Sequence, residues 1–289
     1  MATRKFEVDP IEYPFKSHWY NRNGVNMHYI DEGSGVPVVM CHGNPTWSFL
    51  YRKIIKLMAG KCRCIAYDLP GFGMSDHPQG YGYTPQEHAE WLEAFLIDHL
   101  QLDNFILVMQ DWGGPTSLSV ATRHPERIAG LVISNTWAWE TTAPVMRLFS
   151  KALGNRFSQN IIRKHNIFAK YITRLFCKPM RAPNIFHAYT APFPTPQSRE
   201  GTAVFPYQIV AANPWLKTLE ADLGKLKGTS VEFIFAGKDP ICDKAAIQRW
   251  LGHFPDAGVQ MISKAGHYIQ EENPEAFELS LDRLLNKLD

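Results

Sequence analysis

Short apolar runs alternate with helix-like patterns along most of this 289-residue chain, and that alternation constrains its fold more than any other feature. Runs that are apolar throughout are typical of strands buried on both faces of a parallel sheet. We expect such strands at Val36–Cys41, Arg63–Tyr67, Phe105–Met109, Leu131–Asn135, Val231–Ala236 and Val259–Ile262. Helices are expected at Phe49–Met58, Thr84–Leu100, Gly114–His124, Asp243–His253 and Pro274–Leu288. The series predicts an α/β fold, a mostly parallel twisted sheet flanked by helices.

Two local signals refine this prediction. The turn signal Asn23-Gly24 predicts an antiparallel pair of strands, Ser17–Asn21 and Val25–Asp31, before the parallel series begins. Thr84, followed by Glu87 three residues later, predicts a capping box at the start of its helix.

Residues 137–213 differ from the rest, because helical patches alternate there with prolines and no buried strand is visible. We interpret this segment as a helical cap inserted into a core domain made of residues 1–136 and 214–289. The cap holds ten Lys or Arg residues but only Glu140 and Glu200, a net charge of +8. Solvated helix faces explain most such charge, and the apolar and basic character of the cap makes self-association possible.

The composition excludes several classes of protein. With 45% apolar residues and a net charge of +2, the chain is neither disordered nor membrane-spanning, and it has no overall basic character for binding nucleic acid. The charged and proline-containing N-terminus does not resemble an export signal. Five cysteines without a metal-like spacing indicate free thiols in a reducing compartment: Cys41, Cys62, Cys64, Cys177 and Cys242. We therefore expect a cytoplasmic protein without a membrane or nucleic-acid partner.

Polar residues that could carry chemistry follow four of the predicted strands. Asp111 lies at a strand–turn–helix junction that looks like a nucleophile elbow, and no G-x-S-x-G motif occurs in the chain. The turn at Asn44 could direct its backbone N–H, with that of Trp112, toward an oxyanion. His267 follows the last strand and Asp239 the strand before it, the order expected for a base and the acid that orients it.

Two simpler explanations compete with this assignment. Asp111 could serve only as a helix cap, since an isolated Asp at such a junction usually does. Asp243 is a second carboxylate near the expected acid, and we assign it to capping the helix that follows. The four strand ends together favour catalysis, because a nucleophile, an acid, a base and a backbone-donor turn rarely occur in this order by chance.

With these residues identified, the chain resembles the haloalkane dehalogenases of the α/β-hydrolase superfamily over nearly its whole length. The resemblance rests on His42 to Ser48, Asp68 to Ser75, Gln110 to Gly114, Asn166 to Phe168 and Gly266 to Glu271. In that family the side chains that match Asn44 and Trp112 hold the leaving halide. One large subfamily places the acid after the sixth strand, but Ile133 to Thr136 contain no carboxylate. Asn44 with an acid at Asp239 is most similar to the third subfamily, whose preferred substrates generalise least.

The resemblance implies a hydrolase that converts a small halogenated aliphatic substrate and water into an alcohol and a halide ion. Asp111 would displace the halide and form an alkyl ester, which water activated by His267 would hydrolyse. Asp239 would support His267, while Asn44 and Trp112 would hold the halide. We expect neither a metal nor another cofactor.

Three other functions remain possible at this point. Epoxide hydrolases resemble the chain in the Asp nucleophile, His base, acid and cap, but they need two cap tyrosines, for which Tyr171, Tyr189 and Tyr207 are candidates. A ligand receptor and a coelenterazine-type luciferase share the scaffold. Trp47 could line the pocket, and Trp137 or Trp139 could supply a further halide donor, but we expect all three to pack, since Asn44 already serves as a donor.

Overall fold

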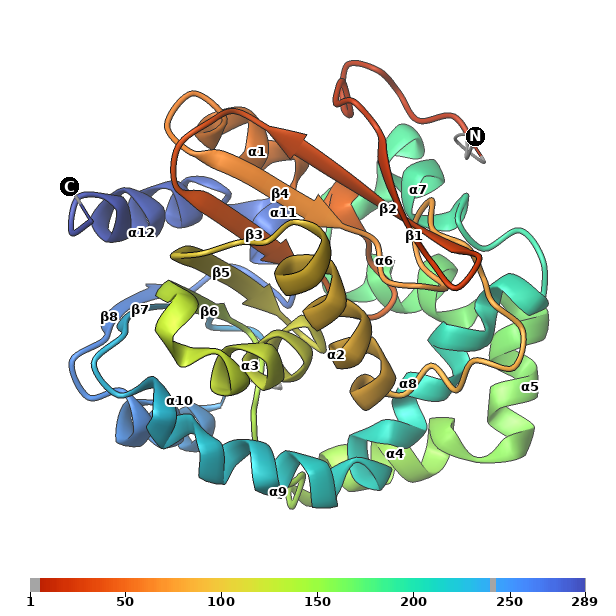
Figure 1. The fold of residues 1–289 in the computed structure, drawn as a ribbon. Helices are drawn as coiled ribbons and strands as arrows, with labels where there is room; N and C mark the ends of the chain where they lie inside the picture. Colours follow the sequence, from red (N-terminus) through yellow and green to blue (C-terminus); the bar gives the residue numbers. More distant parts are fainter. Residues whose placement is uncertain (1–5, 240–242, 289) are drawn as a thin grey trace.

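An eight-stranded sheet runs through the centre of the computed structural model, which describes residues 6–239 and 243–288 (Figure 1). The strand order is β1-β2-β4-β3-β5-β6-β7-β8, in which β2 is antiparallel to both neighbours and the remaining pairs are parallel. The strands are β1 (His18–Arg22), β2 (Val25–Glu32), β3 (Pro37–Cys41), β4 (Arg63–Tyr67), β5 (Phe105–Gln110), β6 (Ile128–Ser134), β7 (Ser230–Ala236) and β8 (Gly258–Ile262). The predicted α/β architecture is confirmed.

Helices cover both faces of this sheet. They are α1 (Arg52–Met58), α2 (Pro85–Glu93), α3 (Gly113–Arg123), α4 (Pro144–Gly154), α5 (Arg156–His165), α6 (Thr173–Phe176), α7 (Pro183–Thr190), α8 (Glu200–Ala211), α9 (Asn213–Asp222), α10 (Lys244–His253), α11 (Ile269–Glu272) and α12 (Glu275–Leu285). Shorter 3₁₀ or π turns are η1 (Ser48–Tyr51), η2 (Ala94–His99), η3 (Pro125–Arg127), η4 (Phe168–Ile172), η5 (Pro179–Arg181), η6 (Gln197–Arg199) and η7 (Leu223–Leu226).

Alternate residues of the central strands enter two separate cores. Val39 and Leu107 belong to a cluster with side chains of α2, α3 and α10, whereas Val38 and Ile106 join a cluster with side chains of α1 and α12. Burial on both faces explains why these strands are apolar throughout rather than alternating with polar residues.

The predicted elements lie within a few residues of the observed ones, and the capping box of α2 is present, with Thr84 accepting from the Glu87 backbone. Two differences have local causes. Strand β6 begins at Ile128 rather than Leu131, because Ala129 and Gly130 interrupt the apolar run without ending the pairing. Helix α9 is not among the predicted helices. It follows α8 almost directly and carries only two buried side chains, so the apolar periodicity of its sequence is weak.

The chain between β6 and β7 forms helices α4–α8, which lie beyond the carboxyl ends of the strands (Figure 1). Within residues 135–229 the structure contains no strand. Large apolar side chains are exposed on these helices, among them Leu148 and Phe157, with exposed fractions of 67% and 75%. The segment is therefore helical, and its division from the core as a cap of residues 137–213 stays a prediction.

Two further expectations concern the cysteines and the membrane. Four cysteines are buried free thiols, as expected: Cys41, Cys62, Cys64 and Cys177. Cys242 lies outside the described residues, as does the start of the N-terminal segment, residues 1–5. In the described ranges, no helix has the length and apolar character needed to cross a membrane.

Candidate active site

Asp111 lies in the sharp turn between β5 and α3, with φ at +52°. A residue other than glycine in this left-handed region is strained, and surrounding contacts must hold it there. A Cβ at Gly113 would collide with the carbonyl group of Cys41 and the carbonyl oxygen of His42, so only glycine lets the turn pack this closely against β3. The local sequence therefore forms the nucleophile-elbow geometry that the motif predicts.

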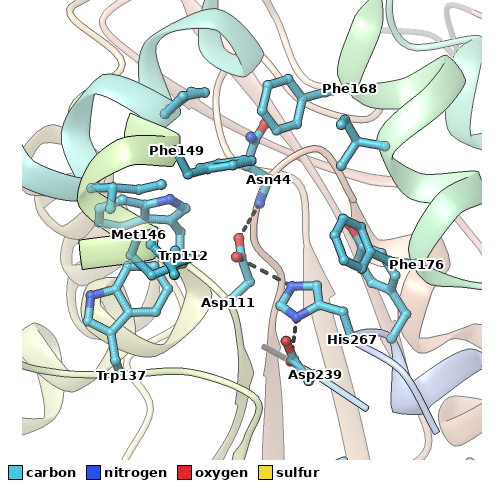
Figure 2. Close-up of a pocket in the computed structure, with 15 residues that line it drawn as sticks. Asn44, Asp111, Trp112, Trp137, Met146, Phe149, Phe168, Phe176, Asp239 and His267 are labelled. Atoms are coloured by element: carbon cyan, nitrogen blue, oxygen red, sulfur yellow. Dashed lines mark hydrogen bonds and ion pairs between the residues drawn. The ribbon is translucent and has the colours of Figure 1, made fainter. Parts of the chain in front are cut away.

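The register of the sheet places a second turn beside Asp111. Cys41 pairs with Met109, so the chain after β3 leaves the sheet next to the chain after β5. The backbone N–H of Asn44 donates a hydrogen bond of 2.8 Å to Asp111 Oδ1 (Figure 2). A side chain at Gly43 would collide with that of Asp111, which explains the glycine in this turn. The turn thus points one backbone donor at the carboxylate, as predicted.

His267 stands between two carboxylates. Its Nδ1 lies 2.6 Å from Asp239 Oδ2, and its Nε2 lies 3.5 Å from Asp111 Oδ2 (Figure 2). Burial lowers the pKa of His267, but Asp239 and Asp111 outweigh it and raise the pKa to about 10. Asp243 instead accepts from the Ala246 backbone at 2.9 Å, so it caps α10 as expected.

Asn135 and Thr136, at the end of β6, fasten the loops that carry these groups. The side-chain amide of Asn135 donates to the carbonyl oxygens of Gly266 and His267 at 3.2 and 3.1 Å, and the Asn135 backbone carbonyl accepts from the Asp111 backbone N–H at 3.1 Å. Thr136 Oγ1 donates to the Asp111 carbonyl oxygen at 2.6 Å. The position at which one subfamily carries its acid therefore serves here to hold the elbow and the His267 loop together.

A cavity of about 270 Å³ opens above Asp111. Its polar side chains are those named above, Asn44, Asp111, Asp239 and His267. Aromatic and aliphatic side chains make the rest of the wall: Trp112, Trp137, Val145, Met146, Phe149, Phe168, Ile172, Phe176, Pro206, Ile209 and Tyr268. Most of these come from α4, η4, α6 and α8, so the cap completes the cavity (Figure 2). Among the described lining residues there is no Lys or Arg.

The tryptophans follow the predictions in part. Trp47 is fully buried and donates to the Ala188 carbonyl oxygen at 3.0 Å, and Trp139 packs against Trp250. Trp137 is buried in the core, as expected, and it also lines the cavity, with its ring 4.9 Å from that of Trp112. Because Trp112 itself lines the cavity, a neighbouring large ring after β6 becomes part of the same wall.

The three cap tyrosines lie away from the cavity. Tyr171 and Tyr207 are 60% and 53% exposed. Tyr189 is buried, but its hydroxyl donates to Glu271 Oε1 at 2.7 Å. None of them is among the described residues that line the cavity, so the structure offers no pair of cap tyrosines facing Asp111.

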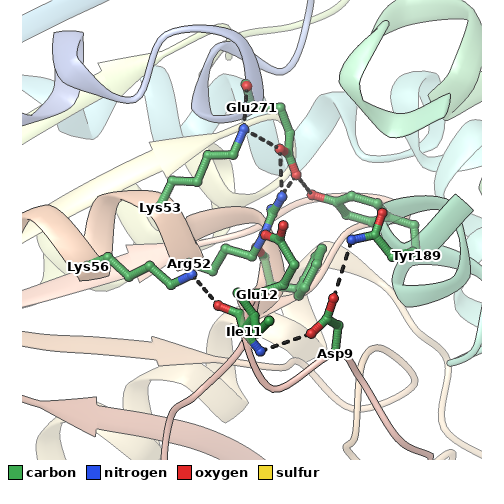
Figure 3. A network of polar contacts seen from close by, with 10 residues as sticks. Asp9, Ile11, Glu12, Arg52, Lys53, Lys56, Tyr189 and Glu271 are labelled. Atoms are coloured by element: carbon green, nitrogen blue, oxygen red, sulfur yellow. Dashed lines mark hydrogen bonds and ion pairs between the residues drawn. The ribbon is translucent and has the colours of Figure 1, made fainter. Parts of the chain in front are cut away.

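A buried ion pair joins α1 to α11, just after His267, and Tyr189 of α7 bonds to the same carboxylate (Figure 3). Arg52 of α1 and Glu271 of α11 are 1% and 0% exposed, and Arg52 contacts both oxygens of Glu271. Lys53 and the Tyr189 hydroxyl also donate to the Glu271 residue, and Glu12 accepts from Arg52 Nε at 2.9 Å. Burial raises the pKa of Glu271, but Arg52 outweighs it and holds the pKa below its usual range.

Sequence reasoning missed one contact inside the site. Gln110, directly before Asp111, is fully buried, and its amide nitrogen lies 2.7 Å from Nε2 of His267. The two residues are 157 positions apart, so no local pattern points to the contact. The signal available in the sequence is a polar side chain at the end of an otherwise apolar strand, which indicates that Gln110 needs a polar partner.

Comparison with known proteins agrees with this geometry. Residues 36–274 match the family model described as the alpha/beta hydrolase fold. Haloalkane dehalogenase 2 of Mycobacterium tuberculosis is 38% identical over 272 residues, which cover 93% of this chain and 95% of that protein. The chain belongs to the haloalkane dehalogenase family.

The other similar proteins include a decarboxylase as well as haloalkane dehalogenases. The cis-3-alkyl-4-alkyloxetan-2-one decarboxylase of Shewanella oneidensis is 36% identical, with 90% of this chain and 85% of that protein covered. Among solved structures, the haloalkane dehalogenase DatA from Agrobacterium tumefaciens superposes with a TM-score of 0.85 at 27% identity, covering 95% and 97% of the two chains. The family and its fold are therefore shown over nearly the full length.

Proposed function

We propose that this protein hydrolyses haloalkanes to an alcohol and a halide ion through a covalent ester on Asp111. The observation that carries the proposal is a carboxylate at the nucleophile elbow of an apolar cavity, with His267 Nε2 at 3.5 Å from it. A hydroxyl nucleophile would leave a stable ether after displacing halide, whereas a carboxylate leaves an ester that water can hydrolyse.

In the first step an Asp111 oxygen attacks the carbon that bears the halogen. The new carbon–oxygen bond forms as the carbon–halogen bond breaks, and the bonding pair leaves with the halide ion. The Asn44 side-chain amide and the Trp112 indole N–H are donors in the cavity wall that can bind the ion. Because both donors are uncharged, they would hold the halide weakly enough to release it.

In the second step His267 removes a proton from a water molecule, and the water oxygen attacks the carbonyl carbon of the ester. The backbone N–H of Asn44, already 2.8 Å from Asp111 Oδ1, and that of Trp112 would hold the oxyanion. The intermediate then collapses, and the proton on His267 passes to the departing alkoxide, which leaves as the alcohol. Asp111, now carrying one oxygen from water, loses the remaining proton to solvent and is again a carboxylate.

The order of the two steps sets the protonation state of His267. In the free enzyme Asp239 and Asp111 both raise the pKa of the ring. Formation of the ester removes the negative charge of Asp111, so the pKa falls and the ring becomes able to accept a proton. Asp239 stays bonded to Nδ1 and stabilises the imidazolium that forms as water attacks.

The test is halide release from brominated and iodinated alkanes by wild type, Asp111→Ala and Asp243→Ala. We expect release by wild type, none by Asp111→Ala, and unchanged release by Asp243→Ala, since that carboxylate only caps α10. Turnover in ¹⁸O-labelled water should place the label in Asp111 before it reaches the alcohol. Opening of styrene-oxide-type epoxides without halide release from any haloalkane would refute the proposal.

A second candidate follows from the Shewanella relative, whose name describes decarboxylation of an alkyl-substituted four-membered lactone. The same Asp111 oxygen could displace the ring oxygen from the saturated carbon, leaving an ester and a free carboxylate. Loss of carbon dioxide with departure of the Asp111 carboxylate would give an alkene. No water or base is consumed, so His267→Ala should abolish haloalkane turnover but leave this reaction, measured as alkene release from a cis-dialkyl oxetan-2-one.

A further inference from the structure

Gln110 makes two contacts with His267 from the residue before the nucleophile. Its amide nitrogen lies 2.7 Å from His267 Nε2 and 3.3 Å from the His267 carbonyl oxygen. Gln110 is fully buried, and its Oε1 has no hydrogen-bond partner among the residues the structure describes. The amide is therefore held by its nitrogen end alone.

These two contacts fix which way the amide faces. Nδ1 of His267 bonds to Asp239 and carries a proton, so in the neutral ring Nε2 is the acceptor. The His267 carbonyl oxygen is also an acceptor, and both partners thus require an N–H of Gln110. Turning the amide over would place its oxygen against the carbonyl oxygen.

The same orientation discriminates between the two forms of the ring. An imidazolium carries a proton on Nε2, which would face the amide N–H across 2.7 Å, donor against donor. A hydrogen bond to the neutral form of a group disfavours its charged form. We propose that Gln110 is a positioning residue that favours the neutral, proton-accepting form of His267 through this hydrogen bond to Nε2 and so counteracts the two carboxylates.

The other groups around His267 act in the opposite sense. Asp111 faces it from the end of β5 and Asp239 from the end of β7, and both carboxylates favour the imidazolium. Tyr268 places its ring 4.8 Å from that of His267, and Glu272 accepts from the Gly266 backbone one residue away. Among these groups, the Gln110 amide is the one that favours the neutral form of His267.

This role belongs to the second step of the proposed function, on which it rests. Displacement of halide needs no base, whereas hydrolysis of the ester needs a neutral His267 with Nε2 available. When water enters, it takes the place of the Gln110 amide at Nε2. The hydrogen bond to the His267 carbonyl oxygen keeps Gln110 in position. Once the ester has removed the charge of Asp111, Gln110 therefore helps to keep Nε2 unprotonated until the nucleophilic water arrives.

The experiment compares wild type with Gln110→Leu, which lacks the donor, and Gln110→Glu, which adds a carboxylate. Gln260→Leu is the control, because that amide bonds to Ala276 and Ser280 away from the site. The imidazole of His267 is titrated by ¹⁵N NMR without substrate. The halide burst and alcohol release are measured as functions of pH with a bromoalkane.

We expect Gln110→Leu to raise the measured pKa of His267 by about one unit, the size of one lost hydrogen bond, and Gln110→Glu to raise it further. The burst rate should stay within about twofold of wild type, while ester hydrolysis slows roughly tenfold at pH 7 and its acid limb moves to higher pH. Gln260→Leu should change neither measurement.

An unchanged His267 titration in both Gln110 variants would overturn the inference, as would equal losses in burst and hydrolysis with an unmoved pH profile, which a merely structural role predicts. Failure of the proposed function is distinguishable. Wild type would then give no halide burst, while the NMR titration would still report whether Gln110 sets the protonation of His267. Refolding and thermal unfolding of Gln110→Glu, which keeps the side-chain shape, check that a loss does not arise from misfolding.

Discussion

Replacing Glu271 by Gln tests how far the buried ion pair stabilises this protein. The side chains of Arg52 and Glu271 are 1% and 0% exposed, so loss of the Glu271 charge leaves the Arg52 guanidinium in the interior. The other carboxylate that contacts Arg52 is Glu12, which is 28% exposed and accepts from Nε alone. Breaking a buried pair in this way costs about 3–5 kcal/mol. For a chain of this size that corresponds to a fall in Tm of roughly 6–20 °C.

Glu12→Gln is the matched control, because it removes a carboxylate from the same guanidinium at the surface. Partly exposed pairs contribute about 0–1 kcal/mol, so its Tm should fall by less than about 4 °C. Differential scanning calorimetry at pH 7 and moderate salt measures both variants. In the combined variant Arg52→Met with Glu271→Leu no buried charge is unpaired, so it should recover part of the loss. Equal Tm shifts for Glu271→Gln and Glu12→Gln would refute the reasoning, because burial would then not set the cost.

Three further predictions concern the acid, the base and the cap. Asp239→Ala should lower haloalkane turnover by orders of magnitude, whereas Asp243→Ala should lower the free energy of unfolding by about 1 kcal/mol with turnover unchanged; the reverse assignment would contradict the acid proposed here. His267 has a pKa raised to about 10 in the folded protein against about 6.5 unfolded, so its stabilisation is full below pH 6.5 and is lost as pH rises toward 10. Urea unfolding should therefore show wild type and Asp239→Asn converging in stability across that window, and a constant gap would argue otherwise. The exposed apolar side chains and net positive charge of the cap predict self-association that increases with ionic strength, since salt screens the repulsion between two basic faces; light scattering that finds monomers at every salt concentration would exclude it.

The positions of Asp111, Asp239 and His267 could be predicted because the sheet itself determines them. Parallel strands are readable as apolar runs, and their carboxyl ends meet at one edge, so the residues that follow them must gather there. The turn at Asn44 follows from the same argument, and the pairing of Cys41 with Met109 is its physical cause.

The wall of the cavity could not be predicted in the same way. Phe149, Phe168 and Phe176 come from helices whose placement depends on packing over the sheet rather than on any local pattern. Trp137 packs in the core as expected, but its second role in the cavity wall depends on where Trp112 lies. The contact between Gln110 and His267 depends on how two distant loops meet, which no spacing in the sequence encodes.

The link between Tyr189 and Glu271 bears on how new specificities can arise in this scaffold. Helix α7 shares a buried hydrogen bond with the loop that carries His267, so exchanging the whole cap between relatives would disturb the base together with the pocket. Helix α4, by contrast, supplies Val145, Met146 and Phe149 to the cavity, and the described residues show none of these three side chains bonded to the His267 loop. We therefore expect single substitutions along α4 to alter the cavity without disturbing His267, whereas changes in α7 would disturb the base as well.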